Sequence, residues 1–147
     1  MAGWVASMNH ETIQHSSNLI STLAKSMPWL GPALTTLVVL FMIFDGVTKV
    51  LKVKPVMEAC EKMNISPGMA VGIGLLLLAC TTLHVIPRTA PLGAILLTGY
   101  LGGAVATHWI ARSGHFPIAF SIVFGVLVWA GLILREPRLL RWIVLQE

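Results

Sequence analysis

The chain has 147 residues, of which 56% are hydrophobic and only 11% are charged, whereas soluble domains carry roughly 25% charged residues. Its apolar residues gather in blocks that are long enough to cross a bilayer, which excludes an ordinary water-soluble domain. The net charge of +4 does not indicate nucleic-acid binding, because the Lys and Arg residues lie between and beyond the apolar blocks, where contacts with lipid headgroups belong.

Residues 1–30 form an N-terminal extension. Within it, residues 9–27 place Ile13, Ile20 and Leu23 on roughly one face of a helix. This spacing is typical of an amphipathic helix that lies in the membrane interface. A tail without fixed structure explains the same residues nearly as well.

The rest of the chain, residues 31–147, contains four apolar blocks. We expect membrane-spanning helices over residues 31–51, 68–86, 92–110 and 116–134, each close to the ~20 residues that a helix needs to cross the hydrocarbon core. The blocks are long and lack polar alternation, which favours helices over strands. The predicted fold class is therefore an all-α integral membrane four-helix bundle. Between the first two spans, Val56, Cys60 and Met63 indicate a short amphipathic helix on the membrane surface.

The orientation follows from the basic residues. One side of the membrane holds Lys25, Arg88, Arg135, Arg138 and Arg141, and the other holds Lys49, Lys52, Lys54, Lys62 and Arg112. If Asp45 neutralises Lys49, the first side has the excess. The positive-inside rule then places both termini in the cytoplasm, and we expect the cell (inner) membrane as the location.

Two charges interrupt the first span. A lone charge at the bilayer centre costs ~2.5–3.5 kcal/mol on insertion scales, but Asp45 and Lys49 are spaced i, i+4 with the acid first, which favours a helical ion pair. Because the spans alternate in direction, further polar residues share this half of the membrane. The predicted cluster, a tentative ligand-binding site, consists of Asp45, Lys49, Tyr100, Thr107, His108, Arg112 and Ser121. It is explained either by a ligand, proton or redox site or by structural polar contacts between helices.

The third span carries the small residues Gly99, Gly102 and Gly103. Their spacing includes a G-x-x-x-G motif, which lets another helix approach closely. We expect tight packing inside the bundle here, with a dimer interface or a slot for a flat ligand as alternatives. Gly103→Leu is accordingly expected to harm folding more than Gly114→Leu.

The sequence contains no evident cofactor motif, metal-ligand cluster or catalytic group. Cys60 and Cys80 lack the C-x-x-C spacing and are expected to be two ordinary free cysteines. His84 is expected to be a satisfied histidine near the interface. No residue pattern predicts a metal site or an enzyme.

The segments "LFMIFDGVTKVLKVKPVMEA", "VGIGLLLLACTTLHVIPRTAPLGAILLTGYLGGAVATHW" and "FGVLVWAGLILREPRLL" together resemble the DoxX-like integral membrane proteins. The similarity covers about residues 37–141. It implies a compact four-helix membrane bundle, and it implies that ten residues belong to the family pattern: Asp45, Lys49, Pro87, Arg88, Tyr100, Gly102, Gly103, Thr107, His108 and Arg135. The loop after His108 is shorter than the family pattern.

Two classes of function follow. The first is an accessory or assembly protein that binds a membrane protein partner, or a second copy of itself, without its own catalysis. The second is intramembrane binding of a small lipophilic molecule such as a quinone, in which case the chain could be a subunit of a redox complex. The partners expected are the lipid bilayer, a protein or homo-oligomer, and a lipophilic small molecule, but no nucleic acid.

Overall fold

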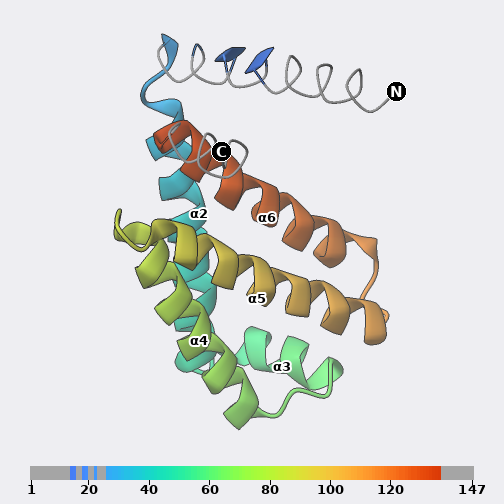
Figure 1. Cartoon of the computed structure of the whole chain (residues 1–147). Coiled ribbons are helices and arrows are strands. Elements are labelled where there is room, and N and C mark those ends of the chain that lie inside the picture. Colours follow the sequence, from blue (N-terminus) through green and yellow to red (C-terminus); the bar gives the residue numbers. More distant parts are fainter. Residues whose placement is uncertain (1–13, 16–17, 20–21, 23–25, 137–147) are drawn as a thin grey trace, which may run out of the picture.

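The computed structural model describes residues 14–15, 18–19, 22 and 26–136. Four helices in this part of the chain are long and apolar enough to span a membrane: α2 (Leu30–Val50), α4 (Pro67–Val85), α5 (Ala90–Ile110) and α6 (His115–Arg135). A shorter helix, α3 (Lys54–Lys62), joins α2 to α4 (Figure 1). The predicted spans and the short connecting helix are confirmed. The expected interfacial helix over residues 9–27 lies mostly outside the described residues.

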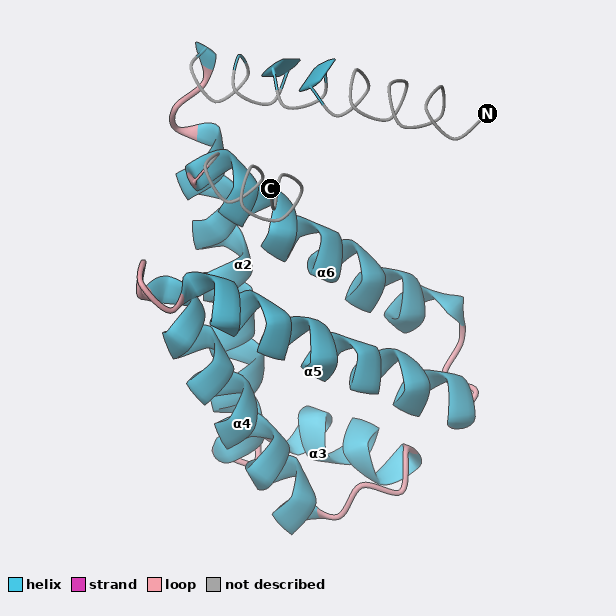
Figure 2. Cartoon of the chain, viewed as in Figure 1, coloured by secondary structure: helices cyan, strands magenta, loops and turns pink. Residues whose placement is uncertain are grey.

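The described residues are helical apart from short loops and contain no strand (Figure 2), so the all-α fold class is confirmed. Proline marks the beginning of three helices, with Pro55 in α3, Pro67 in α4 and Pro91 in α5. Proline is tolerated there because the first N–H groups of a helix have no partner within it. The Ser66 hydroxyl also accepts a hydrogen bond from the backbone N–H of Met69 at the start of α4.

The four long helices form a closed ring. α2 packs against α4 and α6, and α5 packs against the same two helices, so α2 and α5 face each other across the bundle. The buried core follows the axis of this ring and is made of Val38, Met42, Leu77, Leu97, Val128 and Leu132, with smaller residues between them. Much of the outer surface is large and apolar, as expected for helices that face lipid.

Glycines mark the places where two helices approach most closely. A Cβ atom added at Gly93 would lie 2.3 Å from the backbone nitrogen of His84, and one added at Gly131 would lie 2.8 Å from the Thr35 hydroxyl. Gly46 and Gly74 likewise let α2 and α4 meet at backbone distance. The ring is therefore held at these points by contacts that only a residue without a side chain allows.

The glycines that the sequence singled out behave differently. A Cβ atom added at Gly99, Gly102 or Gly103 would meet nothing within 4 Å. The expectation that these three residues pack against another helix of the same chain is therefore corrected. The G-x-x-x-G spacing identifies a face that a helix could approach, but it does not say which helix does so.

The expected order of harm from Gly103→Leu and Gly114→Leu also reverses. Gly103 has open space where a side chain would stand, whereas Gly114 has a φ of 92°, in the left-handed region that residues with a side chain rarely adopt. Gly114→Leu is now expected to be the more harmful of the two substitutions.

A sharper test uses the closest contact. Gly93→Ala should destabilise the bundle by about 1–3 kcal/mol, because the new methyl group would overlap the backbone of His84 and push α5 away from α4. Gly102→Ala, on the same helix but with open space around it, is the matched control and should change stability little. The measurement is thermal unfolding in detergent. Equal losses in the two variants would contradict the contact.

Candidate functional site

A pocket of about 590 Å³ opens among the helices in one half of the bundle. Its walls come from the second halves of α2 and α5, the first halves of α4 and α6, and one face of α3. All of these segments lie at the end of the bundle opposite the turn between α4 and α5 (Figure 1). The volume falls in the range of ~300–1,000 Å³ that is typical of small-molecule sites.

Small side chains leave this volume open. Ala70 on α4, Gly99, Gly103 and Ala104 on α5, and Ser121 on α6 all line the pocket. None of them reaches far enough to fill the space between the helices. Of the three glycines that do not pack against another helix, Gly99 and Gly103 line this pocket and Gly102 does not, which favours the ligand-slot alternative for those two.

One wall of the pocket is aromatic. Phe41 on α2 and Phe116, Phe120 and Phe124 on α6 all line it, and neighbouring rings within this group have centroids 4.5–6.0 Å apart. Such offset and edge-on arrangements present both ring faces and ring edges to a ligand. This wall suits an apolar body, especially a flat one.

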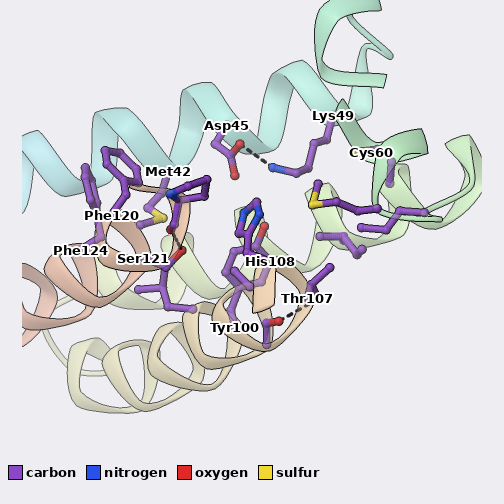
Figure 3. A pocket seen from close by; sticks show the side chains of 18 of the residues that line it. Met42, Asp45, Lys49, Cys60, Tyr100, Thr107, His108, Phe120, Ser121 and Phe124 are labelled. Atoms are coloured by element: carbon purple, nitrogen blue, oxygen red, sulfur yellow. Dashed lines mark hydrogen bonds and ion pairs between the residues drawn. The ribbon is translucent and has the colours of Figure 1, made fainter. Parts of the chain in front are cut away.

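The two charges lie further along α2, one and two turns after Phe41. The Lys49 ammonium contacts the Asp45 carboxylate at 2.5 Å, one turn away on α2 (Figure 3). It is the one ion pair among the described residues. The Lys49 side chain is 15% exposed and that of Asp45 is 30% exposed. The predicted intrahelical pairing is present, and it reduces the cost of placing two charges at this depth.

Two polar side chains of α5 face this ion pair. Tyr100 lines the pocket and lies close enough to Asp45 to be influenced by its charge. The His108 ring points toward Asp45 and Lys49 (Figure 3), but its Nδ1 atom is buried and has no hydrogen-bond partner. Buried polar atoms in native proteins are nearly always paired. Among the described residues, nothing in the pocket pairs with this nitrogen.

The other predicted cluster residues fall into two groups. Thr107 and Ser121 line the pocket, but each hydroxyl donates to a carbonyl oxygen of its own helix, that of Gly103 and that of Pro117 respectively. Arg112 does not line the pocket. It is exposed in the turn after α5, where its φ of 50° turns the chain away from the bundle, so its predicted place in the cluster is corrected.

Sequence reasoning missed the contribution of α3 to the site. Cys60 and Met63 line the pocket from this side, and Cys60 is only 3% exposed. Burial raises the pKa of the Cys60 thiol, so the thiol is protonated at neutral pH. Both cysteines are free and buried. The amphipathic spacing of α3 was the available signal, but it did not reveal what the apolar face covers.

The other histidine lies outside the pocket. His84 is 1% exposed, and its Nδ1 donates a hydrogen bond to the Ala90 carbonyl oxygen at 3.3 Å. Its Nε2 has no partner, so the expectation of a fully satisfied histidine is wrong for one of its two nitrogens. Within the described part of the chain, no group of three or more His, Cys, Asp or Glu residues is arranged to hold a metal ion.

Comparison with known proteins adds one finding. A family model described as the DoxX-like family matches residues 33–131, a range that includes Asp45, Lys49, Tyr100 and His108. No curated protein and no solved structure gives a significant match. The family match covers about two thirds of the chain and all four spans for most of their length.

The ion pair can be tested by a double-mutant cycle. Lys49→Met should destabilise the bundle by about 1 kcal/mol or more beyond the double change Asp45→Asn with Lys49→Met. The single change leaves an uncompensated carboxylate in the membrane, whereas the double change leaves neither charge. The measurement is thermal unfolding in detergent at neutral pH. If the effects of the two substitutions simply add, the residues do not stabilise each other and the pairing has no energetic role.

Proposed function

Because the chain belongs to the DoxX-like family of integral membrane proteins, we propose that its helical bundle serves to bind a small lipophilic molecule in the pocket between α2 and α5. The observation that carries this proposal is the buried, unpaired Nδ1 of His108, which faces the ion pair in a pocket of about 590 Å³. A ligand that reaches this nitrogen would satisfy a polar atom that lipid cannot satisfy.

The aromatic wall and the polar residues suggest how such a ligand lies. Its apolar body packs against Phe41, Phe120 and Phe124, and its polar group reaches Tyr100 and His108. The site groups these polar side chains near the ion pair, which favours a molecule with a single polar end. A ring with an oxygen substituent meets both requirements, and a quinone belongs to this class.

We propose binding rather than catalysis. Asp45 and Lys49 neutralise each other in an ion pair. The Cys60 thiol is protonated because burial raises its pKa. The described residues of the pocket therefore offer no activated nucleophile. This is compatible with an accessory role in which the bundle holds a ligand for another protein.

A second candidate function is association with another membrane helix. The face of α5 that carries Gly99, Gly102, Gly103 and Ala106 is exposed, and its three glycines have nothing within 4 Å of where a side chain would begin. In lipid, such a face is attractive to a second helix because close packing is the main force available. The favoured hypothesis from the sequence, a partner-binding accessory protein, rests on this surface.

We propose the cell (inner) membrane as the location, with both termini in the cytoplasm. The support is the count of basic residues. The pairing of Asp45 with Lys49 removes one positive charge from the side opposite the termini, which leaves five basic residues against four.

Filling the pocket tests the binding proposal. Ala104 lines the pocket, whereas Ala106, two residues further on α5, is exposed and does not line it. Ala104→Phe should abolish co-purification of a lipophilic molecule, and Ala106→Phe should retain it, because only the first ring occupies the ligand volume. Native mass spectrometry of each variant, with a melting curve to confirm folding, makes the comparison. Wild-type protein that carries no lipophilic molecule, even from its native membrane, would refute the proposal.

The association hypothesis has its own matched pair. Gly102 on α5 and Gly72 on α4 are both exposed helical glycines with open space around them. If two copies associate through α5, Gly102→Leu should weaken association on the order of tenfold, because the leucine keeps the helices apart. Gly72→Leu should leave it unchanged. Energy transfer between donor- and acceptor-labelled copies in vesicles measures the effect, and no transfer in the wild type would remove self-association as the explanation.

A further inference from the structure

A second cavity lies at the opposite end of the bundle and shares no residue with the pocket. It has a volume of about 230 Å³ and is lined mainly by Thr35, Thr36, Val39, Leu40, Val85 and Arg135. α2 begins here, while α4 and α6 end here. The groove therefore sits where the spans reach the membrane–water interface, on the side away from the Asp45–Lys49 pair.

The interfacial end of this groove is positive. Arg135 is the last residue of α6, is half-buried, and forms no ion pair with any described residue. The nearest acid in sequence, Glu136, is exposed and does not line the groove. One helix N-terminus and two helix C-termini meet at this groove, so the helix dipoles add no net positive charge and Arg135 alone supplies it. A cation that is partly withdrawn from water and has no counter-charge in the described chain favours an anion as its partner.

The groove also holds an unsatisfied donor. Thr35 is 7% exposed, and its hydroxyl is buried with no hydrogen-bond partner. The hydroxyls of Thr81 and Thr98, by contrast, donate to carbonyl oxygens of their own helices. The hydroxyl of Thr35 thus lacks the usual solution for a threonine in a membrane helix. The Thr35 hydroxyl instead lies against Gly131 in the contact between α2 and α6, whereas Thr36, the next residue, is exposed and lines the groove.

The wall of the groove becomes apolar toward the membrane centre. Leu40 lies one helical turn deeper than Thr36 along α2, and it is 62% exposed, so this flank is open to lipid. Val39 and Val85 continue the apolar surface. A ligand here has a negative, oxygen-rich end at the interface and a hydrocarbon part that extends toward the bilayer centre.

We propose that this groove binds a membrane phospholipid, with its phosphate on Arg135 and the hydroxyl of Thr36, and with the start of an acyl chain against Val39, Leu40 and Val85. A guanidinium matches phosphate in charge and geometry. A cavity of about 230 Å³ holds the headgroup end of the lipid, and the remaining chain stays in the bilayer. This site is independent of the ligand proposed for the pocket.

The experiment uses the full chain, purified in detergent and stripped of lipid. Wild type, Arg135→Gln and Arg88→Gln are compared. Arg88 is the matched control, because it lies at the same end of the bundle but is exposed and does not line the groove. Each protein is titrated with phosphatidylglycerol, with a diacylglycerol that has the same chains, or with sodium phosphate. Native mass spectrometry counts the bound lipid, and thermal unfolding reports its effect on stability.

Phosphatidylglycerol should bind wild type and Arg88→Gln about fivefold more tightly than Arg135→Gln and should raise their melting midpoints by at least about 2 °C. Diacylglycerol and sodium phosphate should do neither. Equal phospholipid binding by wild type and Arg135→Gln would overturn the proposal, as would equal stabilisation by diacylglycerol. Stabilisation by sodium phosphate alone would show a site for a free anion and overturn the lipid assignment.

If Arg135→Gln does not fold, Thr36→Val replaces it, and unchanged phospholipid binding by that variant overturns the proposal.

Discussion

The hydrocarbon core of a bilayer cannot form hydrogen bonds with protein, and the rest of the structure depends on this constraint: every polar group at that depth has to find its partner within the protein or in a ligand. Most polar groups here satisfy the rule locally. Threonine hydroxyls donate to carbonyl oxygens of their own helices, and Asp45 pairs with Lys49 one turn away. The described chain leaves three buried side-chain atoms without partners, in Thr35, His84 and His108. His108 and Thr35 line the two cavities, and His84 immediately precedes Val85 in the groove wall.

The larger pocket lies where it does because the helices are not packed equally along their length. Near the turn between α4 and α5, Gly93 brings α5 against the backbone of His84, and Gly131 brings α6 against Thr35. At the other end α2 and α4 still meet through Gly46 and Gly74, but α5 has no equivalent contact there. The second half of α5 therefore lines a pocket, and α3 covers the space from the membrane surface. A bundle that is tight at one end and open at the other provides both a stable scaffold and a site.

Much of this fold was predictable because a membrane span is recognised from the length and hydrophobicity of its own segment. Neither property depends on which helices pack against it. The pairing of Asp45 with Lys49 was predictable for a similar reason, since spacing on one helix fixes it. The alternation of spans also placed His108 in the same half of the bundle as Asp45, and both line the pocket. Which glycines pack was not predictable, because this depends on the helix that lies opposite each one. The place of Arg112 was not predictable either, because a backbone φ of 50° in the turn after α5 decides it. Cys60 carried no signal of its own, since its role depends on what α3 covers.

The geometry also bears on whether the polar cluster is structural. Polar contacts between helices in membranes contribute only ~0.6 kcal/mol each on average, and they do so by joining two helices. The ion pair here lies within α2 alone, so it cannot by itself hold α2 to α5. The groups on α5 that lie nearest the pair are Tyr100 and His108, and the buried Nδ1 of His108 has no partner among the described residues. If the cluster only held the helices together, that nitrogen would be expected to form a hydrogen bond with another helix. In a ligand-binding site it would stay unpaired until the ligand binds. The unpaired nitrogen beside an open pocket is the feature that supports our binding proposal over a purely structural role for the cluster.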